Sequence, residues 1–151
     1  MSGLRLRVPA GLREVGDALR GGDAPPGGLV FAADPDEPRD FSALEDELAE
    51  CFRLTQEAAA AGAPVVYVLS QPDLLGQRGA LGAMRAGALL SAARSLALEG
   101  ARDGLRANAV AIGAGADADR VATWVRLLLT EPGVSGELVR VDAAHLGKAL
   151  A

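Results

Sequence analysis

The sequence predicts an α/β fold in which helices flank a mainly parallel β-sheet. Three short and mostly apolar runs, at 29–33, 65–69 and 105–112, have the length and composition of strands that are buried on both faces. Longer segments, whose apolar residues recur at helical spacing, lie between these runs. Strands that alternate with helices indicate parallel pairing with right-handed crossovers. The chain has 151 residues, enough for a sizeable core, and we expect a single domain over 1–151.

The first part of the chain is expected to contribute one further strand and two helices. Residues 4–8 alternate apolar and charged side chains, which is the period of a strand, and residues 12–19 then show helical spacing. A long helix is expected over 42–61, after the first of the buried strands. Ser42 is the expected N-cap of this helix, with Glu45 as its capping-box partner.

The second part of the chain is expected to contain two more helices and a last strand. Residues 71–82 are rich in glycine and should form a loop, and a long helix should follow over 83–101. A shorter helix is expected over 118–129 and a strand over 137–141. The tail from about residue 143 is expected to be disordered or frayed.

Composition excludes several classes of partner and of site. The formal net charge is −5 and no run of basic residues is present, so we expect no binding of nucleic acid, which requires clustered Lys and Arg. Cys51 is the single cysteine and His145 the single histidine, which leaves no internal disulfide and no ligand set for a metal. No apolar run is long enough to cross a membrane, and the start of the chain lacks the pattern of a signal peptide. The expected protein is soluble and cytoplasmic.

Four segments carry a resemblance to a known family. In chain order they are 29–34 (LVFAAD), 65–70 (VVYVLS), 95–113 (SLALEGARDGLRANAVAIG) and 134–142 (VSGELVRVD). Together they resemble the later strands, and the stretch after the active-site helix, of the short-chain dehydrogenase/reductase (SDR) family. The match is most specific over 95–113. The resemblance implies a Rossmann-like sheet of the SDR type.

The resemblance also implies a dinucleotide cofactor, but the part of the family pattern that would hold it is absent. SDRs place a glycine-rich turn after their first strand, where backbone N–H groups and a helix N-terminus bind the pyrophosphate. The only glycine-rich candidate, 21–28 (GGDAPPGG), precedes a strand, and its two prolines have no N–H to donate. We therefore expect no cofactor, and a truncated, degenerate member that lacks the N-terminal cofactor-binding β-α-β unit.

Most catalytic residues of the family are missing as well. Alignment on 94–100 (RSLALEG) places Gly82 at the position of the catalytic tyrosine and Ala86 at that of the lysine. Neither side chain can transfer a proton. Glu47 aligns near the asparagine that supports the lysine, and Ser70 falls on the catalytic serine as the only surviving position. We therefore expect no catalytic residue.

Other reactive side chains have simpler interpretations. A nucleophilic Ser70 would need a base, and His145 lies on the distal tail, so a serine that caps a turn is favoured. Tyr67 lies in mid-strand between valines, which favours a packed ring with a satisfied hydroxyl. Cys51 lies on the apolar stripe of a helix, which favours a core or interface position over a reactive thiol.

The helix expected over 83–101 is predicted to be an interface. Its small and apolar residues surround most of its circumference, as in a helix that is buried on both sides. One side should cover the sheet and the other should meet a partner, although a short chain could also fold both sides into its own core. In SDRs this helix and the preceding long helix form a four-helix bundle across a two-fold axis, and the last helix and strand form a second contact. The predicted interface residues are Leu48, Cys51, Phe52, Thr55, Gly87, Leu90, Ala93, Arg94, Ala97 and Trp124.

These observations favour a non-catalytic SDR-like subunit that associates with a catalytically complete SDR or ketoreductase homologue and stabilises or shapes it. An alternative is a homodimer with a structural or small-ligand-binding role. A third hypothesis is an oxidoreductase with residual chemistry at Ser70, or with a site that a partner completes.

Overall fold

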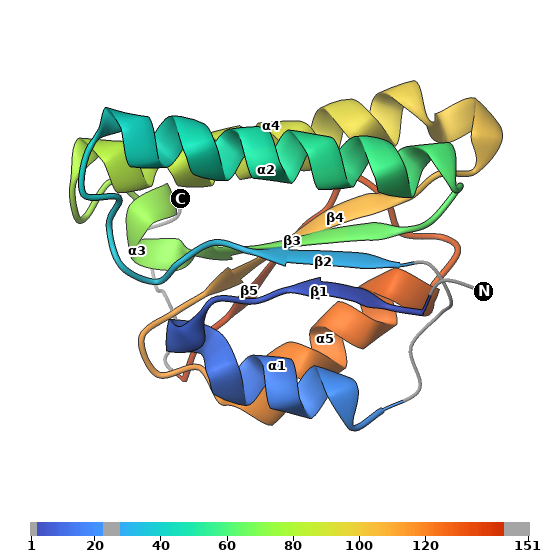
Figure 1. Ribbon diagram of the computed structural model, residues 1–151. Coiled ribbons are helices and arrows are strands. Elements are labelled where there is room, and N and C mark those ends of the chain that lie inside the picture. The colour runs from blue at the N-terminus through green and yellow to red at the C-terminus, as the bar shows by residue number, and fades with distance from the viewer. Residues whose placement is uncertain (1–2, 23–27, 144–151) are drawn as a thin grey trace.

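Five parallel strands form one sheet, and their order in the sheet is their order along the chain (Figure 1). The computed structural model describes residues 3–22 and 28–143. Its strands are β1 (Arg5–Arg7), β2 (Leu29–Ala32), β3 (Val65–Ser70), β4 (Ala107–Ile112) and β5 (Leu138–Val141). Each strand pairs in parallel with the next. The predicted α/β fold with a parallel sheet is therefore confirmed.

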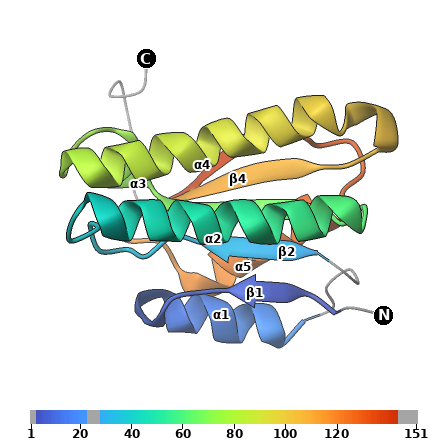
Figure 2. The same ribbon diagram turned by 45° about the horizontal axis from the view of Figure 1, so that its top comes forward.

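Helices cover both faces of the sheet. On one face lie α2 (Phe41–Ala60) and α4 (Ala80–Glu99), and on the other lie α1 (Arg13–Arg20) and α5 (Ala118–Thr130), as Figures 1 and 2 show. A single-turn helix, α3 (Gln71–Leu74), follows β3 directly. Within the described residues, no helix is both long and apolar enough to span a membrane.

Two of the four crossovers are left-handed, which corrects the expectation from the sequence. All strands are parallel and every connection steps in the same direction, so the hand of a crossover depends only on the face on which its helix lies. The crossovers through α2 and α4 are right-handed, and those through α1 and α5, on the opposite face, are left-handed (Figures 1 and 2). The rule for right-handed crossovers considers one strand–helix–strand unit at a time. Here α1 and α5 share one apolar cluster, which fixes both on the same face.

The left-handed connection from β1 through α1 to β2 has a simple relation to doubly wound sheets. In the strand order 3-2-1-4 the chain reverses direction, and its helices change face, after the third strand. In this protein the chain passes from α1 directly to β2, which takes the place of the fourth strand beside β1. The helix α1 stays on the face that it would have in a doubly wound sheet, so the crossover becomes left-handed. Only residues 21–28 connect α1 to β2, too few for a strand, a helix and another strand. β1, α1 and β2 thus form a β-α-β unit, although the turn after β1 lacks the glycine-rich pattern of a cofactor-binding unit.

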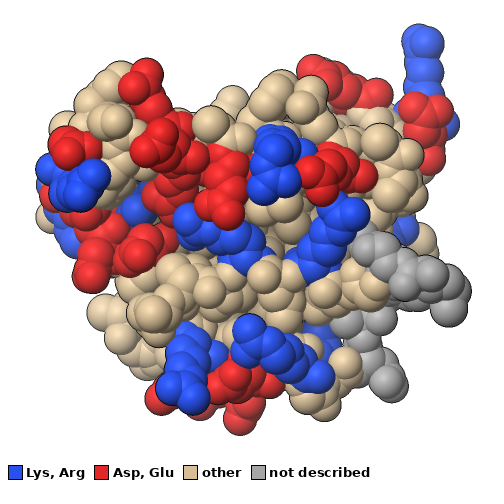
Figure 3. All heavy atoms as spheres, viewed as in Figure 1, with Lys and Arg blue, Asp and Glu red and all other residues tan. Residues whose placement is uncertain are grey.

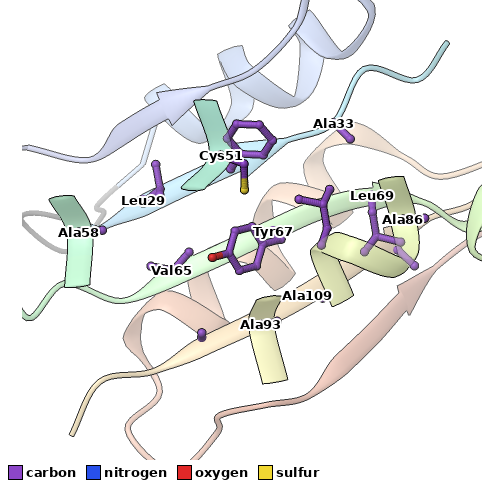
Figure 4. Close-up of a cluster of buried hydrophobic side chains, with 14 of the residues drawn as sticks. Leu29, Ala33, Cys51, Ala58, Val65, Tyr67, Leu69, Ala86, Ala93 and Ala109 are labelled. Carbon is purple, nitrogen blue, oxygen red and sulfur yellow. The ribbon is translucent and has the colours of Figure 1, made fainter. Parts of the chain in front are cut away.

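The sheet divides the core into two apolar clusters. Figure 4 shows the cluster beneath α2 and α4, to which Cys51 and Tyr67 belong. Tyr67 is fully buried, and its hydroxyl forms a 2.8 Å hydrogen bond with that of Thr55. Burial raises the pKa of Tyr67 to about 12 and that of Cys51 to about 11. The packed tyrosine with a satisfied hydroxyl, which the sequence predicted, is confirmed.

The boundaries of the two long helices differ from the prediction. Asp40, not Ser42, is the N-cap of α2, because its carboxylate accepts a 2.8 Å hydrogen bond from the N–H of Ala43. The segment 71–82, expected to be a loop, contains α3 and the beginning of α4. The tail expected to fray from about residue 143 lies almost entirely outside the described residues.

The edge of the sheet at β1 is shielded by ion pairs with α2. Arg5 binds Glu57 at 2.6 Å, and Arg7 binds Glu50 at 3.0 Å. The Arg7 guanidinium also lies 4.7 Å from the centre of the Phe31 ring. Figure 3 shows basic side chains along this edge, below the acidic side chains that gather over α2. Charged side chains on an edge strand discourage its pairing with another chain.

Reversal of the charges on β1 should expose this edge. In the double variant Arg5→Glu/Arg7→Glu, repulsion from Glu57 and Glu50 should lower the free energy of unfolding by about 1–2 kcal/mol and promote self-association. Urea denaturation and sedimentation velocity measure the two effects. Arg13→Glu, on the exposed side of α1, is the matched control and should cause neither. An unchanged sedimentation profile of the double variant would contradict the shielding role.

Candidate functional site

Five ionised side chains form a cluster at the carboxyl end of β3, between α2, α3 and α4. Asp73 and Arg85 lie at its centre and are only 1% and 2% exposed. Arg78 follows α3, and Glu47 of α2 links the centre to Arg7 of β1 through a 3.3 Å ion pair. These five residues, called the charged cluster below, connect four elements of the fold.

The central residues of the charged cluster are fully engaged with one another. Arg78 donates two hydrogen bonds of 2.6 Å, one to each oxygen of Asp73. Arg85 donates to Asp73 at 3.3 Å, to Glu47 at 3.1 Å and to the backbone carbonyl of Asp36 at 2.8 Å. A buried charge is tolerated only when it is paired in this way, and loss of one partner is strongly destabilising.

Local interactions after β3 place the acidic member of the cluster. The Ser70 hydroxyl oxygen is the N-cap of α3 and accepts a 3.4 Å hydrogen bond from the N–H of Asp73, and Pro72 lies in the first turn. Gly76, with φ of +66°, then turns the chain, and Arg78 reaches both Asp73 and, at 3.1 Å, the oxygen of Ser70. Ser70 is thus a helix cap held by a guanidinium, and no histidine lies among the described residues.

Gly82 has no room for a side chain. A Cβ atom at this position would lie 2.5 Å from Oδ1 of Asp73, whose carboxylate Arg78 and Arg85 hold in place. Ala86 is 2% exposed and packs into the apolar cluster beneath α4. The two positions that the resemblance assigns to a tyrosine and a lysine are therefore filled, one by the charged cluster and the other by the core.

The cations of the charged cluster are all arginines, and it contains no tyrosine. Its arginines are permanently protonated, and the hydrogen bond with Asp73 raises the pKa of Arg78 further. Tyr67, the single tyrosine of the chain, has a pKa of about 12 and is bound to Thr55. The ion pairs of the charged cluster hold four elements of the fold together.

A cavity of about 620 Å³ opens on the other side of Ser70. It lies at the carboxyl ends of the strands, between the turn that leads into α1, the ends of β2 and β3, and the segment from β4 to α5. Leu69, Ile112 and Val121 are among its apolar lining residues. Ligands of open α/β sheets bind at this end of the strands.

Four of the predicted interface residues are exposed to solvent. Phe52, Gly87 and Arg94 lie on the outer side of α2 and α4, and Phe52 is 64% exposed. Trp124 is 39% exposed, but it lies on α5, which covers the opposite face of the sheet. Trp124 therefore cannot share one continuous surface with the other three.

The remaining predicted interface residues lie deeper than expected. Cys51 and Ala93, at 4% and 0% exposure, face the sheet and belong to the core, which corrects their assignment to an interface. The Thr55 hydroxyl is bound to Tyr67 inside the molecule. The others are partly buried in the monomer, namely Leu48, Leu90 and Ala97. The sheet takes up one side of each helix, where Cys51 and Ala93 pack into the apolar cluster.

Sequence reasoning missed Asp73, Arg78 and Arg85 as a structural unit. The first two lie in a segment expected to be a loop, and their partner is on a different helix. One signal was available, since Arg85 is the only charged residue in the first half of α4. It lies at helical spacing from Gly82 and Leu89, on the side that faces the sheet.

Comparison with known proteins gives fold neighbours only. No family model and no curated protein matches the chain. A 4-hydroxyisoleucine dehydrogenase, in complex with NADH and succinate, gives a TM-score of 0.64 at 16% identity, over 78% of this chain and 67% of its own. The citronellol catabolism dehydrogenase AtuB of Pseudomonas aeruginosa PAO1 gives 0.63 at 22% identity, over 89% and 68%. The 3-hydroxyacyl-CoA dehydrogenase type-2 from Mycobacterium avium gives 0.65 at 16% identity, over 78% and 66%.

The chain has the Rossmann-like fold of these dehydrogenases. It spans about two thirds of the length of each of them. At such low sequence identity the likeness concerns the fold, and the activity of a neighbour is not carried over with it.

Proposed function

We propose that this chain is a non-catalytic SDR-like subunit that associates with a catalytically complete SDR homologue and stabilises or shapes it. The observation that carries the proposal is the closed tyrosine position, where any side chain on Gly82 would collide with Asp73. The neighbouring lysine position is occupied by Ala86, which contributes only apolar packing. A dehydrogenase-like fold whose proton-transfer positions are used for structure is better suited to association than to catalysis.

The outer surface of α2 and α4 supports association. Of the exposed large apolar residues, four lie on these two helices, namely Phe41, Phe52, Met84 and Leu98. Leu98 is 80% exposed. We call the surface formed by these four residues with Gly87 and Arg94 the α2–α4 face. Aromatic residues, Met and Arg are enriched at protein interfaces relative to the rest of the surface. In SDRs the corresponding helices pair across a two-fold axis, which is why we propose a homologue as the partner.

A homodimer is the second candidate, and the spacing along α4 favours it. Six of the eight exposed residues of α4 recur at alternating steps of four and three, and only Ser95 and Glu99 fall outside this series; the six are Ala80, Met84, Gly87, Ser91, Arg94 and Leu98. This is the 3.5-residue period of a helix that pairs along a seam. In an antiparallel pair of two copies, Ala80 would oppose Leu98 and Gly87 would oppose Ser91. Small residues would thus face large ones or permit a close approach at the centre.

Affinity purification of the tagged full chain from its native cells, followed by native mass spectrometry, tests the proposal. We expect a complete SDR homologue at fixed stoichiometry with this chain. Leu98→Lys should reduce its recovery at least about tenfold, because a charge would be buried in the interface. Leu127→Lys, at a 44% exposed position on α5, is the matched control and should leave recovery unchanged. Recovery of second copies alone would favour the homodimer, and an SDR homologue retained by Leu98→Lys would contradict the α2–α4 face.

A further inference from the structure

The cavity at the carboxyl ends of the strands exists because neighbouring connections leave the sheet toward opposite faces. The connections after β1 and β4 lead to α1 and α5, and those after β2 and β3 lead to α2 and to α3 and α4 (Figure 1). Divergence of this kind opens a crevice that binds ligands in open α/β sheets. One fold neighbour is a complex with NADH, which makes a dinucleotide the first ligand to consider.

The sheet is too narrow for the usual placement of a dinucleotide. Such a cofactor lies across both halves of a doubly wound sheet, on either side of the point where the strand order reverses. Here the order does not reverse, and β1 is the edge of the sheet that the described residues form. The ion pairs of Arg5 and Arg7 with α2 close this edge. One half of a dinucleotide would therefore find no strand ends to lie on.

The turn after β1 is closed to a phosphate group. A pyrophosphate needs a concave turn whose N–H groups are free to donate. Pro35 packs so closely here that a Cβ atom on Gly11 would lie 2.5 Å from the proline Cγ. The N–H groups of Leu12 and Arg13 already donate to carbonyl groups within the turn. The glycine in this turn makes room for a proline ring and leaves no cradle for an anion.

Charge at the cavity also opposes an anion. Glu14, in the first turn of α1, lines both the cavity and an adjoining depression between α1 and α5. Three further carboxylates line this depression, those of Asp17, Asp117 and Asp119. Arg78, on another wall, is already engaged by its two bonds with Asp73. Arg13 also lines the cavity, but its side chain is 83% exposed. Among the residues that the structure describes, a phosphate would thus meet carboxylates without a free, buried cation to offset them.

We propose that this cavity excludes NAD(H), NADP(H) and other phosphorylated ligands and binds an uncharged, mainly apolar small molecule. Its walls combine apolar side chains from several elements, including Val15, Leu69, Ile112 and Val121. A volume of about 620 Å³ is within the range of small-molecule sites. The cavity lies at the strand ends and the α2–α4 face lies on the outer side of two helices, so either inference can fail without the other.

A matched pair of probes tests the proposal on the full chain. Phenol and phenyl phosphate share the same ring and differ in the phosphate. In amide NMR spectra, phenol should shift the signals of Ile112 and Gly113 saturably, and phenyl phosphate should bind at least about tenfold more weakly. NADH and NADPH should show no saturable binding by calorimetry up to about 1 mM. The proposal is overturned by phenyl phosphate that binds as tightly as phenol, by a lack of binding of phenol, or by saturable binding of either nucleotide.

Glu14→Lys tests the electrostatic part of the selectivity. An ammonium in place of this carboxylate should strengthen the binding of phenyl phosphate about fivefold or more and leave that of phenol unchanged. Glu131→Lys, at the other end of α5, makes the same change of charge away from the cavity and should alter neither affinity. Equal effects from the two variants, or no effect from Glu14→Lys, would contradict a selectivity set at the cavity. Unchanged far-ultraviolet circular dichroism establishes that both variants are folded.

Discussion

Replacement of Arg85 by methionine should lower the free energy of unfolding by about 3–5 kcal/mol. The Arg85 side chain lies between Asp73 and Glu47, and its loss removes the buried cation that joins them, leaving Asp73 to Arg78 and Glu47 to Arg7. Methionine keeps much of the length of the arginine stem, so the effect reports the charge more than the packing. Equilibrium urea denaturation followed by circular dichroism measures the change.

Arg94→Met is the matched control for this variant, because Arg94 is on the same helix but exposed on its outer side. It should change the free energy of unfolding by less than about 0.5 kcal/mol. A double-mutant cycle between Arg85→Met and Asp73→Asn should give a coupling energy of about 1–3 kcal/mol. A loss below about 1 kcal/mol for Arg85→Met, or additive effects in the cycle, would show that the charged cluster is not a structural unit.

An attempt to restore the family's tyrosine and lysine should damage the protein instead of activating it. In Gly82→Tyr/Ala86→Lys, the ring needs space that the Asp73 carboxylate occupies, and the ammonium enters an apolar cluster without a partner. We expect a loss of more than about 3 kcal/mol in the free energy of unfolding. Thermal denaturation measures this loss, and an assay for NAD(P)H-dependent carbonyl reduction should give no turnover. A stable double variant that reduces carbonyl compounds would contradict both the closed position and the absence of a cofactor site.

The strands were predictable because their signal is local. Short, continuously apolar runs predict strands that are buried on both faces of a parallel sheet. The runs at β2, β3 and β4 are such strands, and all three are buried almost throughout. The hand of the crossovers was not predictable in the same way. It depends on which face α1 and α5 cover, and this is decided by the apolar cluster that they form together, far apart in the sequence.

For the candidate site, the sequence could predict only that the tyrosine and the lysine of the family are missing. Gly82 and Ala86 follow from counting along the chain, but a count does not show what fills the vacated space. The answer depends on Asp73 and Arg78, from the segment expected to be a loop, and on Arg85, from the helix that folds back against it. The start of α3 was missed for a related reason: its N-cap, Ser70, was weighed as a catalytic position and as a turn, and not as the beginning of a helix.

The most direct measurement compares one substitution at two glycines of α4. Alanine in place of glycine inside a helix normally stabilises a protein by up to about 1 kcal/mol. A Cβ atom on Gly87 would meet nothing within 4 Å, whereas one on Gly82 would meet the carboxylate of Asp73. We predict that Gly87→Ala raises the free energy of unfolding by about 0.5–1 kcal/mol and that Gly82→Ala lowers it by about 1–3 kcal/mol. Equal stabilisation by both substitutions would contradict a tyrosine position that is filled by the charged cluster.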